Sequence, residues 1–316
     1  MNKEELHIAR IKFKNKVLSS SGQAFEDLFV RIMQMSDENF RPVATHGKEG
    51  DKKNDGFNKE MGRYYQVYAP DEPTGKESMS KKKLKETIDG LFDYWQNISP
   101  IKEFYWVFND KFKTGVYPSI EKELSEIERK YNIKAEPFLS SDLEDIFLSL
   151  PDDEIRDILG GFLPDYTQIE NVDLSILGEV IDFLVNVQSN PSDITFPDEV
   201  NFENKIRFNG LSKSYGKILN TAFHQDHIIN EYFRYNSRFA KEEIKEVFKK
   251  IYSEGLEEIP EDIDNKPDLV FEYILEEASP RKENAIIQAV YVLMAHYFES
   301  CDIYKEPQKP EQKKLF

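Results

Sequence analysis

Four oxygen-bearing side chains in the first quarter of the chain have the types and spacing of a metal site. Glu26 belongs to a segment with helical periodicity, and Asp51 and Asp55 stand in a glycine-bounded turn. Gln66 follows Asp55 by eleven residues, in a segment typical of a β-strand. Carboxylate and amide oxygens are ligands for hard cations such as Mg²⁺ or Mn²⁺. A cation held there could activate water and stabilise a leaving phosphate oxygen, which is how a phosphodiester is cut.

These side chains need a helix and several strands to position them. Residues 21–35 predict an amphipathic helix, because apolar residues recur there at intervals of three and four. A glycine-punctuated polar loop, 47–57, leads into a strand. The further elements that we expect are strands at 40–45, 63–69, 104–109 and 133–138, and helices at 80–97 and 118–131. This order predicts a mixed central sheet flanked by helices, an α/β domain over residues 1–160.

The apolar spacing becomes almost wholly helical after Pro151. Only residues 196–208 have an irregular pattern. We expect helices at 174–187, 212–223, 227–235, 241–252, 269–277 and 282–298. The chain should therefore end in an all-helical domain over residues 161–316, suited to partner docking or oligomerisation, with a polar tail from Pro307 to Phe316.

Composition sets limits on the class of protein. The 316 residues carry a formal net charge of −17, which argues against a protein that coats nucleic acid generally. One cysteine excludes a disulfide framework and a cysteine zinc site, and it fits a reducing compartment. The sequence has no apolar signal region and no run of about 20 apolar residues, so we expect a cytoplasmic protein without a membrane span.

Charge is distributed unevenly along the chain. Residues 41–85 hold eleven Lys and Arg against seven Asp and Glu. This local excess favours a focused site for a polyanion, and the alternative is a solvated lysine-rich loop. Residues 254–277 hold ten acids and a single base, Lys266.

Three segments of the N-terminal region resemble the Mrr-type branch of the PD-(D/E)XK nucleases. They are SGQAFEDLF at 21–29, GD…DG at 50–56 and YQVY at 65–68, beside a family pattern of G-x-x-F-E-x-L, G-D-x-G-x-D and Q-x-K. The resemblance implies a restriction-endonuclease-like fold that binds DNA and Mg²⁺ or Mn²⁺. It makes Glu26 the metal-site glutamate of the helix, Asp55 the principal metal ligand and Gln66 the first residue of Q-x-K. Asp51 matches the first aspartate of the turn and is less surely a ligand.

One position departs from that pattern. The resemblance implies a lysine that positions or activates the attacking water, yet Tyr68 stands in its place. The loss either disables the enzyme or moves the role to another lysine, as happens within this superfamily. Lys85 is our first choice, because it falls near the apolar face of the helix at 80–97. The other candidates are Lys53 in the turn, and Lys81 and Lys83 in the same helix.

A second resemblance spans most of the chain, with looser motifs. The chain resembles the third component of ABC-three component systems, bacterial anti-phage or anti-plasmid assemblies to which Lamassu is related. The segments that carry this resemblance are 66–70, 108–110, 142–144, 205–211 and 299–303. It implies an N-terminal effector fused to a helical domain that docks on an SMC-like ATPase and a small middle component. Residues 254–277 would then be a docking or autoinhibitory surface, the alternative being a solvated acidic loop.

The two resemblances together imply a metal-dependent DNA endonuclease, the effector of a bacterial defence complex that stays inactive until its ATPase partner senses foreign DNA. Many such effectors cut only when several copies bring their sites together, so a homo-oligomer is a further expectation. Two other classes remain open. One is a catalytically inactive, nuclease-like DNA-binding or scaffolding subunit, and the other is a structural adaptor with no affinity for DNA.

Overall fold

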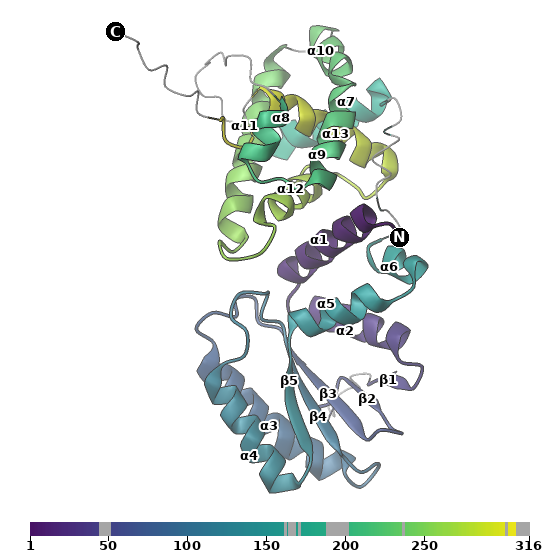
Figure 1. Ribbon diagram of the computed structural model, residues 1–316, viewed down its shortest axis with the longest axis vertical. Coiled ribbons are helices and arrows are strands. Elements are labelled where there is room, and N and C mark those ends of the chain that lie inside the picture. The colour runs from purple at the N-terminus through teal and green to yellow at the C-terminus, as the bar shows by residue number, and fades with distance from the viewer. Residues whose placement is uncertain are drawn as a thin grey trace, which may run out of the picture. The chain divides into compact units, whose positions relative to one another are not determined.

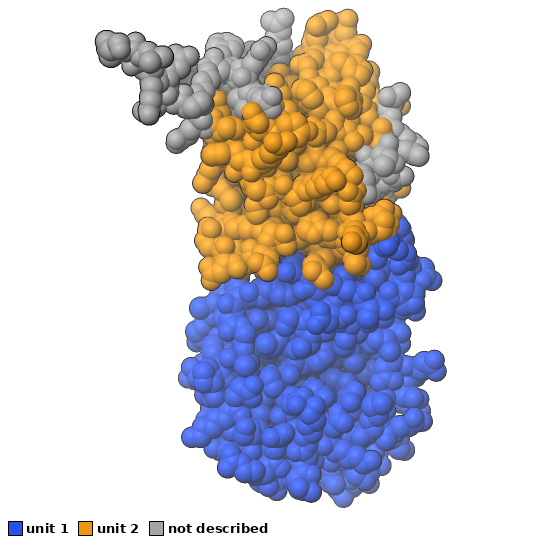
Figure 2. Space-filling model, viewed as in Figure 1, with its two compact units in different colours: residues 1, 12–161 blue, residues 2–11, 162–316 orange. Residues whose placement is uncertain are grey.

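A computed structural model describes residues 1–43, 52–160, 163, 169, 172–187, 202–235, 238–300 and 303–307. The chain divides into two compact units, coloured separately in Figure 2. Unit 1 comprises residues 1 and 12–161, and unit 2 comprises residues 2–11 and 162–316. Residues 2–11 thus group with unit 2, although they precede unit 1 in the sequence.

Unit 1 is built on a five-stranded mixed sheet in which the strands follow one another in chain order. Its strands are β1 (Phe40–Pro42), β2 (Gly56–Asn58), β3 (Arg63–Tyr68), β4 (Glu103–Phe108) and β5 (Lys134–Phe138). The first three pair antiparallel, whereas β3, β4 and β5 run parallel. The carboxyl ends of β3 and β4 therefore lie at the edge of the sheet where β2 begins.

Helices cover both faces of this sheet (Figure 1). On one face, α3 (Glu77–Trp95) and α4 (Pro118–Tyr131) bury apolar side chains against Tyr64, Trp106 and neighbouring aromatic residues. On the other face, Phe29 of α2 (Gly22–Ser36) packs against Tyr65 and Phe138, and α5 (Ser140–Ser149) lies beside α2. The predicted mixed sheet with flanking helices is confirmed.

Three helices of the first half are not among the expected elements: α1 (Lys3–Ser19), α5 and α6 (Asp152–Ile158). In α1 the buried side chains Ile8, Ala9, Phe13 and Val17 point in several directions around the helix axis. Such a helix has no single apolar stripe and so no periodic signal in the sequence. Helices α5 and α6 span only ten and seven residues, too few for a clear period.

The described part of unit 2 is helical, as predicted. It contains α7 (Leu174–Val187), α8 (Phe202–Phe208), α9 (Lys213–Phe223), α10 (Asp226–Tyr235), α11 (Arg238–Glu258), α12 (Lys266–Glu277) and α13 (Asn284–Glu299). Helix α13 is apolar on all sides because α7, α9, α10, α11 and α12 all contact it. The expectation of irregular structure at 196–208 is wrong for α8, and residues 196–201 lie outside the described residues. No helix in the described ranges has the length and apolar character needed to cross a membrane.

Candidate functional site

The central feature of unit 1 is a buried pair of side chains, Asp55 and Gln66. Asp55 directly precedes β2, and the register that pairs Gly56 with Tyr65 places it beside Gln66 of β3. The Asp55 Oδ2 atom accepts a hydrogen bond from Gln66 Nε2 at 2.5 Å and one from the Val67 backbone N–H at 2.6 Å. Both side chains are buried. The structure therefore brings together two of the predicted metal-site residues.

The turn before β2 fixes the position of Asp55. The Asp55 backbone N–H donates to the Tyr65 carbonyl at 3.0 Å, and buried Asn54 accepts the Gly56 N–H at 3.2 Å. A Cβ at Gly56 would lie 2.2 Å from Phe40 Cζ, so only glycine lets this aromatic ring pack over the strand. Lys52 and Lys53 both have positive φ, a strained conformation that often marks functional turns.

Two buried polar atoms at this pair have no hydrogen-bond partner among the described residues. They are the amide oxygen Oε1 of Gln66 and the amide nitrogen of Asn54. An acceptor that is desolvated without a donor costs free energy, so each such atom calls for a physical explanation. A hard cation would supply the missing partner of an amide oxygen. Among all the residues that the structure describes, those at this pair included, no group of three His, Cys, Asp or Glu side chains could hold a metal ion.

Glu26 approaches the same edge of the sheet through the start of α2. The Gly22 N–H donates to the carbonyl of Ala69, just past the end of β3, at 2.7 Å. Glu26 lies one turn further along α2, half-buried, and accepts a hydrogen bond from Gln23 Nε2 at 3.2 Å. Asp51, the fourth predicted ligand, lies outside the described residues.

Asn109 is a buried residue at this edge of the sheet that is not among the site residues predicted from the sequence. Its N–H donates to the Tyr68 carbonyl at 3.0 Å, and its side-chain amide donates to the carbonyls of Ser20 and Val17 at 2.9 and 3.3 Å. It therefore ties the segment that enters α2 to the ends of β3 and β4. The available signal was its place in the Phe108–Asp110 motif, directly after a buried strand.

Tyr68 occupies the position where a lysine was expected. Its ring stacks on Trp106 and Phe108 at centroid distances of 5.6 and 5.9 Å. Burial, and to a lesser extent the nearby Tyr117, raises the pKa of the Tyr68 hydroxyl. This hydroxyl is therefore protonated at neutral pH and cannot provide the positive charge of a lysine.

The candidate lysines have different partners. Lys85, our first choice, forms an ion pair with Glu123 of α4 at 3.2 Å, and Lys81 shares that carboxylate at 3.4 Å. Lys85 thus lies in a groove between α3 and α4. The stem of Lys53 lies against Gly90 of α3, where an added Cβ would be 2.9 Å from Lys53 Cγ. The Lys83 ammonium lies 4.9 Å from the centroid of the Tyr68 ring.

In unit 2, two segments singled out in the sequence, 205–211 and 299–303, come together. Buried Lys205 of α8 donates to the carbonyl of Phe298, near the end of α13, and to that of Ile303 at 2.9 Å. Asn209 exchanges two hydrogen bonds with the backbone of Lys305, both of 2.8 Å. The last carbonyls of a helix have no partner within the helix, and the ammonium of Lys205 donates to one of these, that of Phe298, as well as to Ile303 beyond the helix end.

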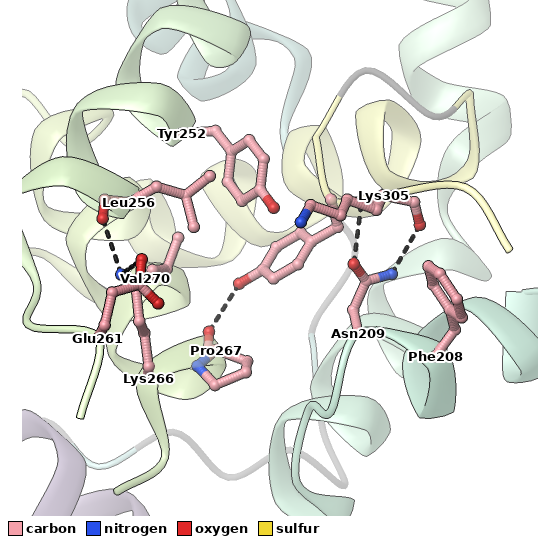
Figure 3. A pocket seen from close by; sticks show the side chains of 10 residues that line it. Phe208, Asn209, Tyr252, Leu256, Glu261, Lys266, Pro267, Val270 and Lys305 are labelled. Atoms are coloured by element: carbon pink, nitrogen blue, oxygen red, sulfur yellow. Dashed lines mark hydrogen bonds and ion pairs between the residues drawn. The ribbon is translucent and has the colours of Figure 1, made fainter. Parts of the chain in front are cut away.

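The same contacts form one wall of a pocket of about 520 Å³, seen in Figure 3. Phe208 and Asn209 line one side of it and Tyr252 and Leu256 the other. Lys266 donates to the Leu256 carbonyl and to Glu261, each at 2.8 Å. The pocket lining is thus mixed, with apolar and aromatic side chains beside Asn209, Lys305 and the ion pair of Lys266 and Glu261.

Residues 254–277 are not a solvated loop, because they include the end of α11 and all of α12. Two of their acids are buried: Asp268 accepts the Ser212 N–H at 2.9 Å, and Glu272 accepts the Tyr215 hydroxyl at 2.8 Å. Burial, together with neighbouring glutamates, raises the pKa of Tyr273 to about 12. The stretch therefore combines a buried polar layer with an acidic outer face.

Comparison with known protein families identifies part of unit 2. Residues 175–305 match the family model of C-terminal domain 10 of the ABC-three component (ABC-3C) systems. This segment is therefore similar to a domain of the ABC-three component systems, which agrees with the helical part of the second resemblance. The match covers less than half of the chain and does not reach the Asp55–Gln66 pair. Searches of curated proteins and of solved structures gave no match.

Proposed function

We propose that unit 1 is a metal-dependent DNA endonuclease and that the chain is the effector of a bacterial anti-phage or anti-plasmid complex. The observation that carries this proposal is the buried Asp55–Gln66 pair, in which the Gln66 Oε1 atom has no donor among the described residues. A buried carboxylate beside such an amide oxygen is a donor set suited to Mg²⁺ or Mn²⁺.

Asp55 and Gln66 would hold the cation, with Glu26 as a further oxygen donor. Asp51, which lies outside the described residues, is a further ligand expected from the sequence alone. When bound, the cation would lower the pKa of water and neutralise charge on the phosphate. The protein itself orients the donors, because Asp55 accepts both the Gln66 amide and the Val67 N–H. Lys52 and Lys53, next to Asp55 in the turn, would contact the phosphates of the DNA backbone.

The family match at residues 175–305 supports membership of a multi-component system. In this proposal an SMC-like ATPase and a small middle component bind unit 2 and keep the nuclease inactive until foreign DNA is sensed. Assembly into a homo-oligomer would bring several nuclease sites together on one DNA.

One observation favours a second candidate, a catalytically inactive subunit that binds DNA or acts as a scaffold. Tyr68 fills the expected lysine position and stacks on Trp106 and Phe108, so no ammonium projects from that point of β3. The two candidates share the binding of DNA and differ in its hydrolysis.

Purified protein should be incubated with supercoiled plasmid and with linear DNA in Mg²⁺ or Mn²⁺, at low and high protein concentration. We expect nicking that disappears on chelation and in the Asp55→Asn variant. Binding without cutting at any concentration would favour the second candidate. Absence of DNA binding even at low salt, where phosphate contacts are strongest, would leave the structural adaptor.

A further inference from the structure

We propose that the ammonium group of Lys83 in α3 contacts the scissile phosphate, and that the ring of Tyr68 holds this ammonium in place. This inference rests on the proposed nuclease function. It assigns to a helix the positive charge that β3 itself lacks.

The rotation of α3 separates Lys83 from its neighbours. Side chains three or four residues apart share one face of a helix, so Lys83 lies on the face of Ser80 and Thr87. Both of these residues are completely buried, and their hydroxyls have no hydrogen-bond partner among the described residues. Lys83 is therefore directed along the buried edge of α3, toward the sheet.

Lys81 and Lys85 share a different face of α3. They are four residues apart, and both ammonium groups contact the buried carboxylate of Glu123. If Lys81 or Lys85 turned toward the sheet, Glu123 would lose a counter-ion. The Lys83 ammonium lies over Tyr68 instead, so its position does not depend on Glu123. Of the three lysines, Lys83 is the one whose ammonium lies over a side chain of β3.

The Tyr68 ring holds the Lys83 ammonium against β3, the strand that carries Gln66. The ammonium lies 4.9 Å from the ring centroid, within the range of a cation–π interaction. Gln66 and Tyr68 are two residues apart on β3, so their side chains share a face about 7 Å apart. Trp106 and Phe108 fix the Tyr68 ring from the neighbouring strand. The ammonium is thus held over the side chain that follows Gln66 on the same face of β3.

The role of Lys83 follows from the chemistry of phosphodiester hydrolysis. The oxygen of water forms a bond to phosphorus, the bond from phosphorus to the leaving sugar oxygen breaks, and a proton from water ends on that oxygen. Negative charge accumulates on the non-bridging oxygens during the transfer. The Lys83 ammonium would remain protonated and donate hydrogen bonds to one of these oxygens, which stabilises the transition state.

The test compares Lys83→Ala with Lys82→Ala in single-turnover cleavage with Mn²⁺. Lys82 is exposed and forms an ion pair with Glu86 of its own helix, so it is the matched control. We expect Lys83→Ala to cut at least about 100-fold more slowly and Lys82→Ala to cut like the wild type. Mn²⁺ affinity, followed by electron paramagnetic resonance, should be unchanged in both variants.

A second variant guards against a merely structural effect. Adding Tyr68→Lys to Lys83→Ala returns an ammonium to β3 itself and should restore at least about tenfold of the lost rate, as expected for a transition-state contact. DNA binding can be measured in Ca²⁺, since this readout requires no cleavage. Under these conditions Lys83→Ala should also lower, by about one, the slope of log affinity for duplex DNA against log salt concentration. Unchanged cutting and an unchanged slope in Lys83→Ala would overturn the inference. If the wild type binds neither Mn²⁺ nor DNA, the proposed function fails first, and Lys82→Ala and Asp55→Asn will be equally inert.

Discussion

The side-chain amide of Gln66 in β3 donates a 2.5 Å hydrogen bond to the carboxylate of Asp55, which directly precedes β2. The same carboxylate oxygen accepts the backbone N–H of Val67 at 2.6 Å. Asp55 therefore does two things at once: it joins the start of β2 to the end of β3, and it orients an amide oxygen that has no donor among the described residues. Substitutions of Asp55 should separate these two contributions.

Asp55→Asn should abolish metal-dependent cutting and preserve the fold, because an amide oxygen can still accept both hydrogen bonds but no longer carries charge. Asp55→Ala should also abolish cutting, and it should lower the free energy of unfolding by about 1–3 kcal/mol, since two buried donors lose their acceptor. Plasmid cleavage and urea denaturation measure the two effects. Cutting at the wild-type rate in Asp55→Asn would show that the metal-site assignment is wrong.

Glu26→Gln should reduce cutting with little change in stability, because Glu26 is half-buried and its hydrogen bond to Gln23 lies on the surface of α2. Cleavage at increasing Mn²⁺ concentration is the informative measurement. A ligand of the cation would shift the curve to higher Mn²⁺, whereas Asp27→Asn, one residue further and exposed, serves as the control. Identical curves for both variants and the wild type would remove Glu26 from the site.

Gly56→Ala should destabilise unit 1 by about 1–3 kcal/mol, the usual effect of overfilling a well-packed core. The cause is the Phe40 ring, whose Cζ atom would lie 2.2 Å from the new methyl group. Phe40→Leu in the Gly56→Ala background should recover part of the loss by making room. Thermal unfolding of the single and double variants gives the coupling free energy between positions 40 and 56. Losses of stability that simply add would contradict a direct clash.

The alkaline stability of unit 1 should depend on Tyr65. Burial, only partly offset by Arg63, raises the pKa of Tyr65 to about 12 in the folded protein, from an unfolded value near 10. The contribution of Tyr65 to the free energy of unfolding is complete below pH 10 and is lost as the pH rises toward 12, because the unfolded chain releases the tyrosine proton first. The free energy of unfolding should fall by about 2–3 kcal/mol more in the wild type than in Tyr65→Phe over this range. Parallel urea titrations of both proteins at pH 9 and pH 12 measure the two changes. An equal fall in the free energy of unfolding in the wild type and in Tyr65→Phe would refute the prediction.

Lys205→Met should destabilise unit 2 by about 2–4 kcal/mol, because the carbonyls of Phe298 and Ile303 would remain buried without their donor. Methionine preserves the length of the side chain, so the loss reports the ammonium and not a cavity. Urea denaturation followed by circular dichroism measures the effect on this helical unit. Lys213→Met, at the start of α9, provides a matched control with the same change of charge.

The part of the fold that could be predicted from the sequence is the part with a regular apolar period. Helix α2 was predicted almost to its ends, because Phe25, Leu28, Phe29, Ile32 and Met33 form one stripe that is buried against the sheet. Helix α1 could not be predicted, since its buried residues lie all around its axis. The short α8 was missed because the buried contacts of Lys205, a charged residue, carry no apolar signal.

The site shows the same division. The proximity of Asp55 and Gln66 could be anticipated, because a turn followed by paired strands brings two such positions together. The partners of the lysines could not be anticipated, because the side chain that each lysine meets depends on the rotation of α3 about its axis to within a fraction of a turn. Positions 81 and 85 contact Glu123 whereas position 83 contacts Tyr68, so nearness to the apolar face of the helix, which selected Lys85, did not identify the lysine that faces β3.

The grouping of residues 2–11 with unit 2 has a consequence for synthesis on the ribosome. His7 contacts Asp268 at 2.9 Å across 261 residues of sequence. At about 5–20 residues per second, the ribosome needs roughly 13–52 s to make Asp268 after His7. During that interval the first turns of α1 have no completed unit to join, while the sheet of unit 1 can already close. Unit 1 could thus fold before unit 2, and the bond between His7 and Asp268 could form only after both ends of unit 2 have been made.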